Sequence, residues 1–202
     1  MTRYTLYPII SILWSFQLKT DRKQQILHCA VEIICNQGYS ALSMRALARS
    51  SGIKLGALQY HFPTWKDLLE ALAAYINEQY TSRNETDHDP EYPQDLKGFL
   101  QYIFDDKAGE SLYSVRLFPQ LWAMAQVEPI MAGLLEEMYG LYRQNLEQQL
   151  KNIGSSAPLQ EALVLISFFE GSNYFVGKEG LWPEHRQAVF EKLLAFVDDY
   201  YS

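Results

Sequence analysis

Between residues 43 and 66 lies a set of residues whose chemistry matches a polyanionic partner. The set comprises Ser43, Arg45, Lys54, Gly56, Gln59, Tyr60 and Lys66. Lysine and arginine neutralise phosphates, while glutamine, serine and tyrosine form hydrogen bonds with phosphates or base edges. These residues can act together only if local structure presents them on one surface.

A short helix over residues 43–50 can provide the first part of that structure. Met44, Leu47 and Ala48 share one helical face, and the serine at position 43 is a candidate N-cap. Gly52 follows where the helix must stop and the chain must reverse, a position that favours a left-handed residue without Cβ. A tight turn is therefore predicted at Gly52.

A second short helix follows that turn. Leu55 and Leu58 are spaced to face inward, Phe62 and the following proline end the helix, and Thr64 with Asp67 forms a predicted capping box for a third helix. The pattern indicates a helix-turn-helix, whose second helix is built to enter a DNA major groove.

The positions of the polar residues on this unit suggest their roles. Lys54, Gln59 and Tyr60 are candidates for contacts with base edges or phosphates, as are the serine and arginine at the start of the first short helix. Gly56 would let the backbone approach the duplex. Lys66, beside a helix N-terminus, is a candidate phosphate anchor. His61 could equally pack within the protein or contact DNA.

The segment Asp21–Leu72, which is 52 of 202 residues, resembles the DNA-binding domain of the tetracycline-repressor (TetR) family. The resemblance lies in Asn36-Gln37-Gly38-Tyr39, Ser43-Met44-Arg45, Ala48, Gly52-Ile53, Gly56-Ala57-Leu58, Tyr60-His61-Phe62-Pro63 and Asp67-Leu68-Leu69. It implies a transcriptional regulator, a repressor, that binds a palindromic operator in double-stranded DNA as a homodimer. A small, largely apolar or aromatic effector would release or modulate it.

Three positions depart from the family pattern. Lys54 stands where a capping serine or threonine is usual, and Gln59 stands where an aromatic residue commonly contacts phosphate. Trp65 occupies a position where the family often has lysine, which appears here one residue later. Gln59 could instead read an adenine through two hydrogen bonds.

The distribution of charge agrees with this organisation. The net charge is −7, but residues 1–67 hold eight Lys/Arg against three Asp/Glu, whereas residues 68–202 hold nine against twenty-one. The basic excess therefore coincides with the helix-turn-helix, as phosphate contact requires. We expect an N-terminal extension of unknown role (1–20), a DNA-binding domain (21–68) and a helical effector-binding and dimerisation domain (69–202).

An all-α fold is predicted for the whole chain. Apolar residues recur at helical spacing over 21–37, 64–82, 93–104, 111–126, 129–152, 158–176 and 183–201, and no strand-like alternation occurs. The acidic stretch 84–94 contains two prolines and predicts a loop. The apolar run at 7–18 is shorter than the roughly 20 residues that cross a bilayer. An extension that packs on the body or on a partner is favoured over a targeting signal.

Aromatic residues are frequent in the C-terminal part, where the resemblance implies an effector cavity. The candidate pocket residues are Phe99, Tyr102, Tyr113, Arg116, Phe118, Trp122, Tyr139, Tyr142, Phe169 and Asn173. Pockets for small molecules are mostly apolar with a few polar groups, and here Arg116 and Asn173 are the polar candidates. Core packing is the competing interpretation for each ring.

The last two helices carry apolar residues on more than one side, which exceeds the need of a helix with one solvent face. They are the candidate dimer surface, forming a four-helix bundle with their copies. The candidate interface residues are Leu163, Ile166, Val189, Leu193, Phe196, Val197 and Tyr200. Burial within the monomer is the alternative.

Other classes of protein are disfavoured. The four histidines are scattered, and the sequence has no HExxH, phosphate loop or GxSxG turn, so we expect neither an enzyme nor a metal or other cofactor. Two cysteines six residues apart on one helix point to different sides, which favours a reducing, cytoplasmic location without a membrane partner. A helical protein-interaction module without an effector is the alternative function.

Overall fold

The computed structural model describes residues 22–84, 93, 95–105, 114–178 and 180–201. Within these ranges the regular elements are all helical and no strand occurs, which confirms the predicted all-α class. Packing divides the chain into two units, the first ending at Leu72 and the second beginning at Ala73. The predicted extension over residues 1–20 and most of the acidic loop lie outside the described residues.

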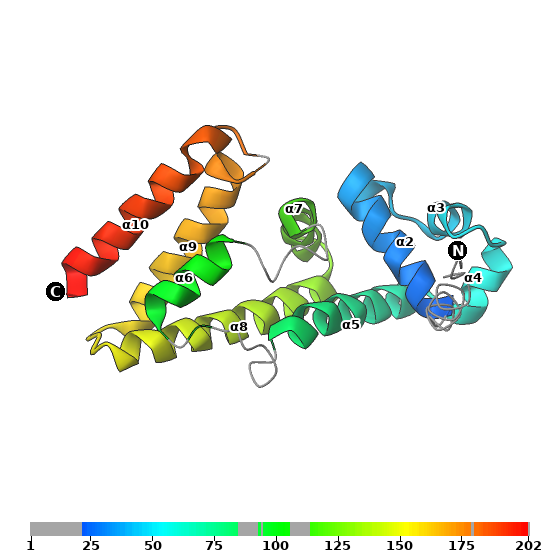
Figure 1. Cartoon of the computed structure of the whole chain (residues 1–202). Coiled ribbons are helices and arrows are strands. Elements are labelled where there is room, and N and C mark those ends of the chain that lie inside the picture. The colour runs from blue at the N-terminus through cyan, green and yellow to red at the C-terminus, as the bar shows by residue number, and fades with distance from the viewer. Residues whose placement is uncertain (1–21, 85–92, 94, 106–113, 179, 202) are drawn as a thin grey trace, which may run out of the picture. The chain divides into compact units, whose positions relative to one another are not determined.

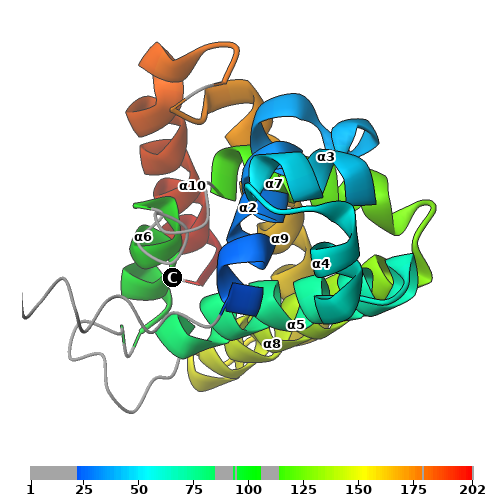
Figure 2. The same cartoon turned by 90° about the vertical axis from the view of Figure 1, so that its right-hand side faces the viewer.

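The first unit contains three helices, a 3-10 turn and the beginning of a fourth helix (Figures 1 and 2). In chain order they are α2 (Arg22–Gln37), η1 (Tyr39–Ala41), α3 (Met44–Ser50), α4 (Leu55–His61) and α5 (Trp65–Asn84). Their apolar faces form one small core, whose fully buried members include Ile26, Ile34, Leu47, Leu58, Phe62, Leu68 and Leu72. Each helix of the unit contributes at least one of these side chains.

Local signals define where the short helices begin and end. The Ser43 hydroxyl accepts a hydrogen bond from the backbone N–H of Ala46 at 3.2 Å and so caps α3. Gly52 has φ +66°, the left-handed conformation expected at the turn. Both predictions from the sequence are confirmed.

Helix α5 begins with the predicted capping box. The backbone N–H of Thr64 donates to the Asp67 carboxylate at 2.8 Å, and the backbone N–H of Asp67 donates to the Thr64 hydroxyl oxygen at 3.1 Å. The Thr64 hydroxyl also donates to the carboxylate at 2.6 Å. These hydrogen bonds hold the pKa of Asp67 below its ordinary value of 3.8.

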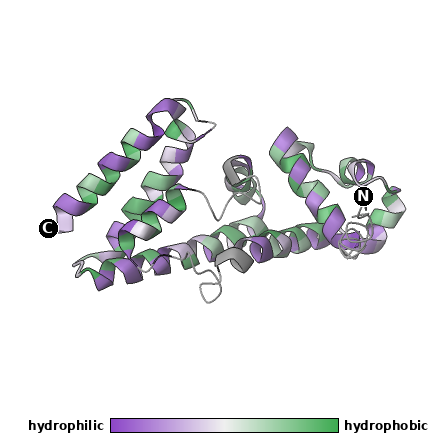
Figure 3. Cartoon of the chain, viewed as in Figure 1, coloured by the Kyte–Doolittle hydropathy of each residue, from purple (hydrophilic) through white to green (hydrophobic). Residues whose placement is uncertain are grey.

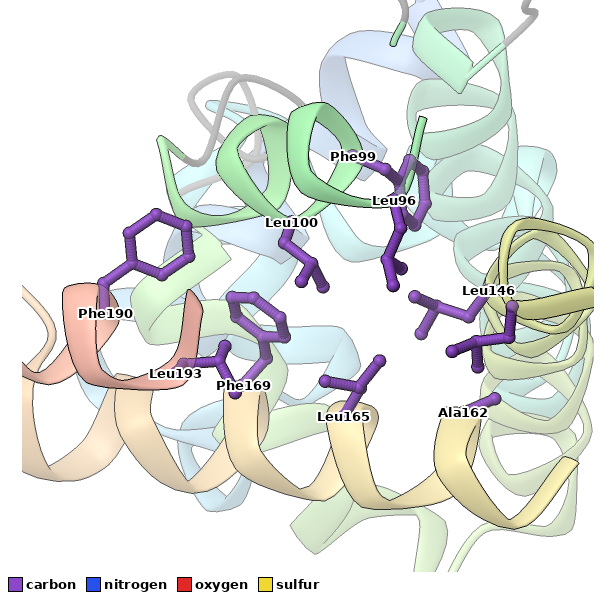
Figure 4. Packing of buried hydrophobic residues seen from close by; sticks show 10 residues of the cluster. Leu96, Phe99, Leu100, Leu146, Ala162, Leu165, Phe169, Phe190 and Leu193 are labelled. Carbon is purple, nitrogen blue, oxygen red and sulfur yellow. The ribbon is translucent and has the colours of Figure 1, made fainter. Parts of the chain in front are cut away.

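The second unit is a helical bundle in which α8 (Pro129–Asn152) packs against α7 (Ser114–Ala125) and α9 (Pro158–Val176). Helix α6 (Leu96–Phe104), the 3-10 turn η2 (Pro183–His185) and α10 (Arg186–Tyr201) complete it. In Figure 4 side chains from α6, α8, α9 and α10 point toward one another. This core contains Leu96, Phe99, Leu100, Leu146, Leu150, Ala162, Leu165, Phe169, Phe190 and Leu193.

Two predicted helix boundaries were wrong by several residues. Helix α6 begins after Asp95, not at Pro93, because the Asp95 carboxylate accepts the backbone N–H of Gly98 at 2.8 Å and caps the helix there. The last segment does begin at Pro183, but its first three residues form the 3-10 turn η2 and the α-helix starts at Arg186. The helices predicted at 129–152 and 158–176 have the expected bounds.

The capping box of α5 can be tested through protein stability. Thr64→Ala removes both hydroxyl interactions with Asp67, and we expect it to lower the free energy of unfolding by about 1 kcal/mol near neutral pH. Because the pKa of folded Asp67 is depressed, its contribution is complete above pH 3.8 and is lost as the pH falls through the folded pKa. Urea unfolding should therefore show a deficit that is constant from pH 7 to about pH 5 and shrinks below about pH 4.

Glu70→Gln is the control for this experiment, because Glu70 is an exposed acid one turn further along the same helix. It should not reproduce the deficit. An equal stability of the Thr64→Ala variant and the wild type at pH 7 would contradict the assigned cap.

Candidate nucleic-acid interface

Helix α4 has one buried and one exposed side. Leu58 is completely buried and anchors the helix, while Leu55 is half-buried beside it. Lys54, Gln59 and Tyr60 are exposed on the other side, and Tyr60 exposes 86% of its surface. An isolated protein has little reason to leave a tyrosine so exposed, so this surface is available to a partner.

Backbone hydrogen bonds in the turn before α4 fix the direction of α4 relative to α3. The backbone N–H of Ile53 donates to the carbonyl of Ala48 at 3.0 Å, and that of Gly52 donates to the carbonyl of Arg49 at 3.1 Å. Ala48 itself is buried, with only 4% of its surface exposed. A larger side chain at this buried position would have to displace its neighbours in the core.

Gly56 leaves the backbone of α4 uncovered on the exposed side. A Cβ atom built at this position would meet nothing within 4 Å. The glycine is therefore not required by packing inside the protein. The space above it is open to an approaching molecule, as the sequence-based assignment of Gly56 supposed.

The remaining candidate contacts also lie at the surface, but two already have partners. Arg45 is exposed near the start of α3. The Ser43 hydroxyl oxygen serves the α3 cap, which leaves its hydrogen to donate. The Lys66 ammonium lies 3.6 Å from the Glu70 carboxylate in an exposed ion pair, which water screens and a phosphate could replace.

His61 lies at the edge of this surface. It is half-buried, and its ring makes an edge contact with Tyr60 at 5.6 Å between centroids and a tilted contact with Phe62 at 6.4 Å. Phe62 belongs to the core of the unit. The histidine ring therefore bridges the core and the exposed tyrosine.

The candidate pocket residues of the second unit fall into three groups. Phe99, Tyr102 and Phe169 are buried, and Phe99 and Phe169 belong to the core of Figure 4. Four others are half-buried: Phe118, Trp122, Tyr139 and Tyr142. The two polar candidates, Arg116 and Asn173, are both exposed. Tyr113 lies outside the described residues.

Several of these rings meet a residue that the sequence reasoning missed. The Trp122 indole N–H donates to the Tyr139 hydroxyl oxygen at 2.9 Å, and the Tyr139 hydroxyl and the Glu170 carboxyl on α9 are close enough to affect each other's pKa. Burial raises the pKa of Glu170, and the nearby Tyr139 hydroxyl opposes that shift. Helix α9 contains two glutamates, and nothing in the sequence indicates that Glu170 rather than Glu161 meets these rings.

The candidate dimer residues differ in exposure. Leu163, Phe196 and Tyr200 expose 48, 68 and 68% of their surface, respectively. The half-buried members are Ile166, Val189 and Val197. Leu193 is only 8% exposed and belongs to the core of the unit, so it is committed mainly to the monomer.

An apolar groove lies next to these residues, with a volume of about 400 Å³. It is lined by Phe168, His185, Ala188, Val189, Lys192, Leu193 and Phe196. Further large apolar residues, among them Val164, Tyr174 and Phe175, are also exposed on α9. Figure 3 shows hydrophobic residues on α9 interrupted by hydrophilic ones, and in Figure 1 α9 and α10 run in opposite directions.

No helix within the described ranges combines the length and apolar character needed to cross a membrane.

Comparison with known proteins agrees with the helix-turn-helix geometry. Residues 26–72 match the family model of the bacterial regulatory proteins of the tetR family. The nucleoid occlusion factor SlmA of Vibrio cholerae is 28% identical over 184 residues, which cover 78% of this chain and 85% of the relative.

Two solved structures share the fold. A transcriptional regulator from Saccharomonospora viridis in complex with choline has 18% identity and a TM-score of 0.72, with 88% of this chain and 97% of that chain covered. The multidrug binding protein EbrR complexed with ethidium has 22% identity and a TM-score of 0.59, covering 86% and 98%. Family and fold are those of transcriptional regulators rather than of enzymes. Residues 26–72, which contain the basic helix-turn-helix, therefore match the tetR family of bacterial regulatory proteins, and the chain as a whole has the fold of the compared transcriptional regulators.

Proposed function

We propose that this regulator is a repressor that binds a palindromic operator as a homodimer and that a small effector modulates its binding. The observation that carries the proposal is the exposed side of α4. Burial of Leu58 orients the helix so that Lys54, Gln59 and Tyr60 face outward. Such a helix lies in the major groove when it binds DNA, with its N-terminal residues near the base edges.

A second copy of the chain is the proposed partner of α9 and α10. Exposed apolar surface on a folded monomer commonly marks an interaction site, and a two-fold axis would place each patch against its own copy. Leu163, Phe196 and Tyr200 supply large apolar side chains to that patch. The dimer would present two recognition helices about 34 Å apart, matching successive major grooves.

The aromatic interior of the second unit supports an effector role. Fold relatives with bound choline and ethidium show that proteins of this architecture accommodate small organic molecules. The effector would bind one orientation of α5 better than another, because this helix continues from the first unit into the second. Only such a difference in affinity can shift the population between DNA-binding and released states.

Gln59 offers a direct test of base recognition. If its amide reads one adenine through two hydrogen bonds, Gln59→Ala should lose about 1–3 kcal/mol of discrimination at that base pair and little elsewhere. The DNA upstream of the chain's own coding region serves as the probe, with each operator position substituted in turn. Fluorescence anisotropy then gives the affinity for every substituted site.

Lys66→Ala is the matched control, because a phosphate contact carries no sequence information. It should weaken binding to all sites alike and reduce the slope of log affinity against log salt by about 0.9. An unchanged base preference in Gln59→Ala would remove Gln59 from the specificity set. Failure of the wild type to bind this DNA would instead favour the alternative, a helical protein-interaction module.

Dimerisation through α9 and α10 predicts that a charge at Phe196 separates the subunits. Phe196 is 68% exposed in the monomer, so Phe196→Asp should leave each chain folded while it introduces an unpaired charge into the interface. Sedimentation velocity should show a monomer at micromolar concentration for the variant and a dimer for the wild type.

Val127→Asp is the control, because it places the same charge at a residue of similar exposure outside the proposed interface. Val127 is 66% exposed and follows α7, whereas the proposed interface is formed by α9 and α10. This variant should remain dimeric. If Phe196→Asp also sediments as a dimer, α9 and α10 are not the interface.

A further inference from the structure

Four helices of the second unit bring aromatic residues around one carboxylate. Glu170 belongs to α9, Tyr139 and Tyr142 to α8, Trp122 to α7 and Tyr80 to α5. The hydroxyls of Tyr80, Tyr139 and Tyr142 are close enough to influence one another electrostatically, and Glu170 acts on the last two. Residues far apart in the sequence thus form one cluster, which we call the Glu170 cluster.

The cluster contains one geometric hydrogen bond close to the carboxylate. The Trp122 indole donates to the Tyr139 hydroxyl oxygen at 2.9 Å, which leaves the hydrogen of that hydroxyl available, and the hydroxyl is near enough to Glu170 to affect its pKa. The Phe118 ring packs edge-on against Tyr80 at 6.2 Å between centroids and extends the aromatic wall. Each ring therefore has a defined neighbour.

Two groups in the cluster lack the partners that buried polar atoms normally have. Among the described residues, Glu170 forms no ion pair with a lysine, arginine or histidine. The buried Tyr142 hydroxyl likewise finds no hydrogen-bond partner within the described part of the chain. A buried polar group without a partner is costly, and a ligand that supplies the missing partner is one physical explanation for it.

The pKa of the Glu170 carboxyl group is shifted as expected for a carboxylate that has no positive charge beside it. Burial raises the pKa of Glu170, so the ligand-free protein disfavours its ionised form. A positive charge close by would stabilise the carboxylate. The faces of tryptophan and tyrosine rings attract the same kind of charge through their quadrupoles.

We propose that the Glu170 cluster binds the effector and that the effector is an organic cation with an apolar body, for which Glu170 supplies the countercharge and Trp122, Tyr139 and Tyr142 supply aromatic walls. This inference rests on the proposed role of the second unit as an effector domain. It narrows the expected class of effector from apolar or aromatic compounds in general to those that carry a positive charge. The orphan Tyr142 hydroxyl is available to a hydrogen-bonding group on the same ligand.

A pair of isosteric probes tests the charge preference. (3-Hydroxyphenyl)trimethylammonium and 3-tert-butylphenol have nearly the same shape, but only the first is cationic. Tetraphenylphosphonium serves as a larger cation. Isothermal titration calorimetry with the full-length protein should show binding of at least one of the two cations, with the ammonium probe preferred over the phenol by about tenfold or more.

Glu170→Gln keeps the size and hydrogen-bonding capacity of the side chain but removes its charge. It should reduce the affinity for the cations about tenfold or more and leave the affinity for the phenol unchanged. Glu161→Gln is the matched control. Glu161 is another half-buried acid on α9, and it accepts hydrogen bonds from Ser155 and Tyr201. This variant should bind the cations like the wild type.

Three results would overturn the inference: binding of neither cation by the wild type, equal affinity for the ammonium probe and the phenol, or equal loss of both probes in Glu170→Gln. Circular dichroism of each variant establishes that the fold is retained. DNA binding, measured separately by anisotropy, shows whether the cation-binding inference has failed or the proposed repressor function has failed. A protein that binds operator DNA without preferring cations contradicts only the inference, whereas one that prefers cations but binds no DNA contradicts only the repressor role.

Discussion

The burial of one leucine determines which side of the second short helix faces outward. Leu58 has no exposed surface, so the rotation of α4 about its own axis is fixed by the core of the first unit. The capped start of α3 and the left-handed Gly52 then fix its direction relative to α3. Lys54 and Tyr60 are exposed as a consequence of this packing, and the orientation of the proposed DNA-binding surface is therefore set by the core.

The sequence was most informative where one residue type has one local function. Ser43 and the Thr64–Asp67 pair could be assigned as caps because their side chains bond to backbone groups only three residues away. Gly52 could be placed because few other residues accept its backbone conformation. Such signals require no knowledge of distant contacts, and they predicted the helix-turn-helix in detail.

Tertiary contacts in the second unit were much harder to predict. The sequence favours Asn173 as a polar group for a pocket, yet Asn173 is exposed, while Glu170 three residues earlier is half-buried. Both lie on α9, which is apolar around much of its circumference, so periodicity does not reveal which face meets α8. The start of α6 was misplaced for a related reason, because Pro93 and Asp95 are both acceptable near a helix N-terminus and the Asp95 side chain takes the cap.

The central claim is that two copies of α4 enter successive major grooves of one DNA duplex. Hydroxyl-radical footprinting of the full-length protein on the DNA upstream of its coding region tests this most directly. The account predicts two protected segments, related by a two-fold axis and centred about one helical turn, or roughly 34 Å, apart. A single protected block without this symmetry, or no protection at low salt, would contradict it.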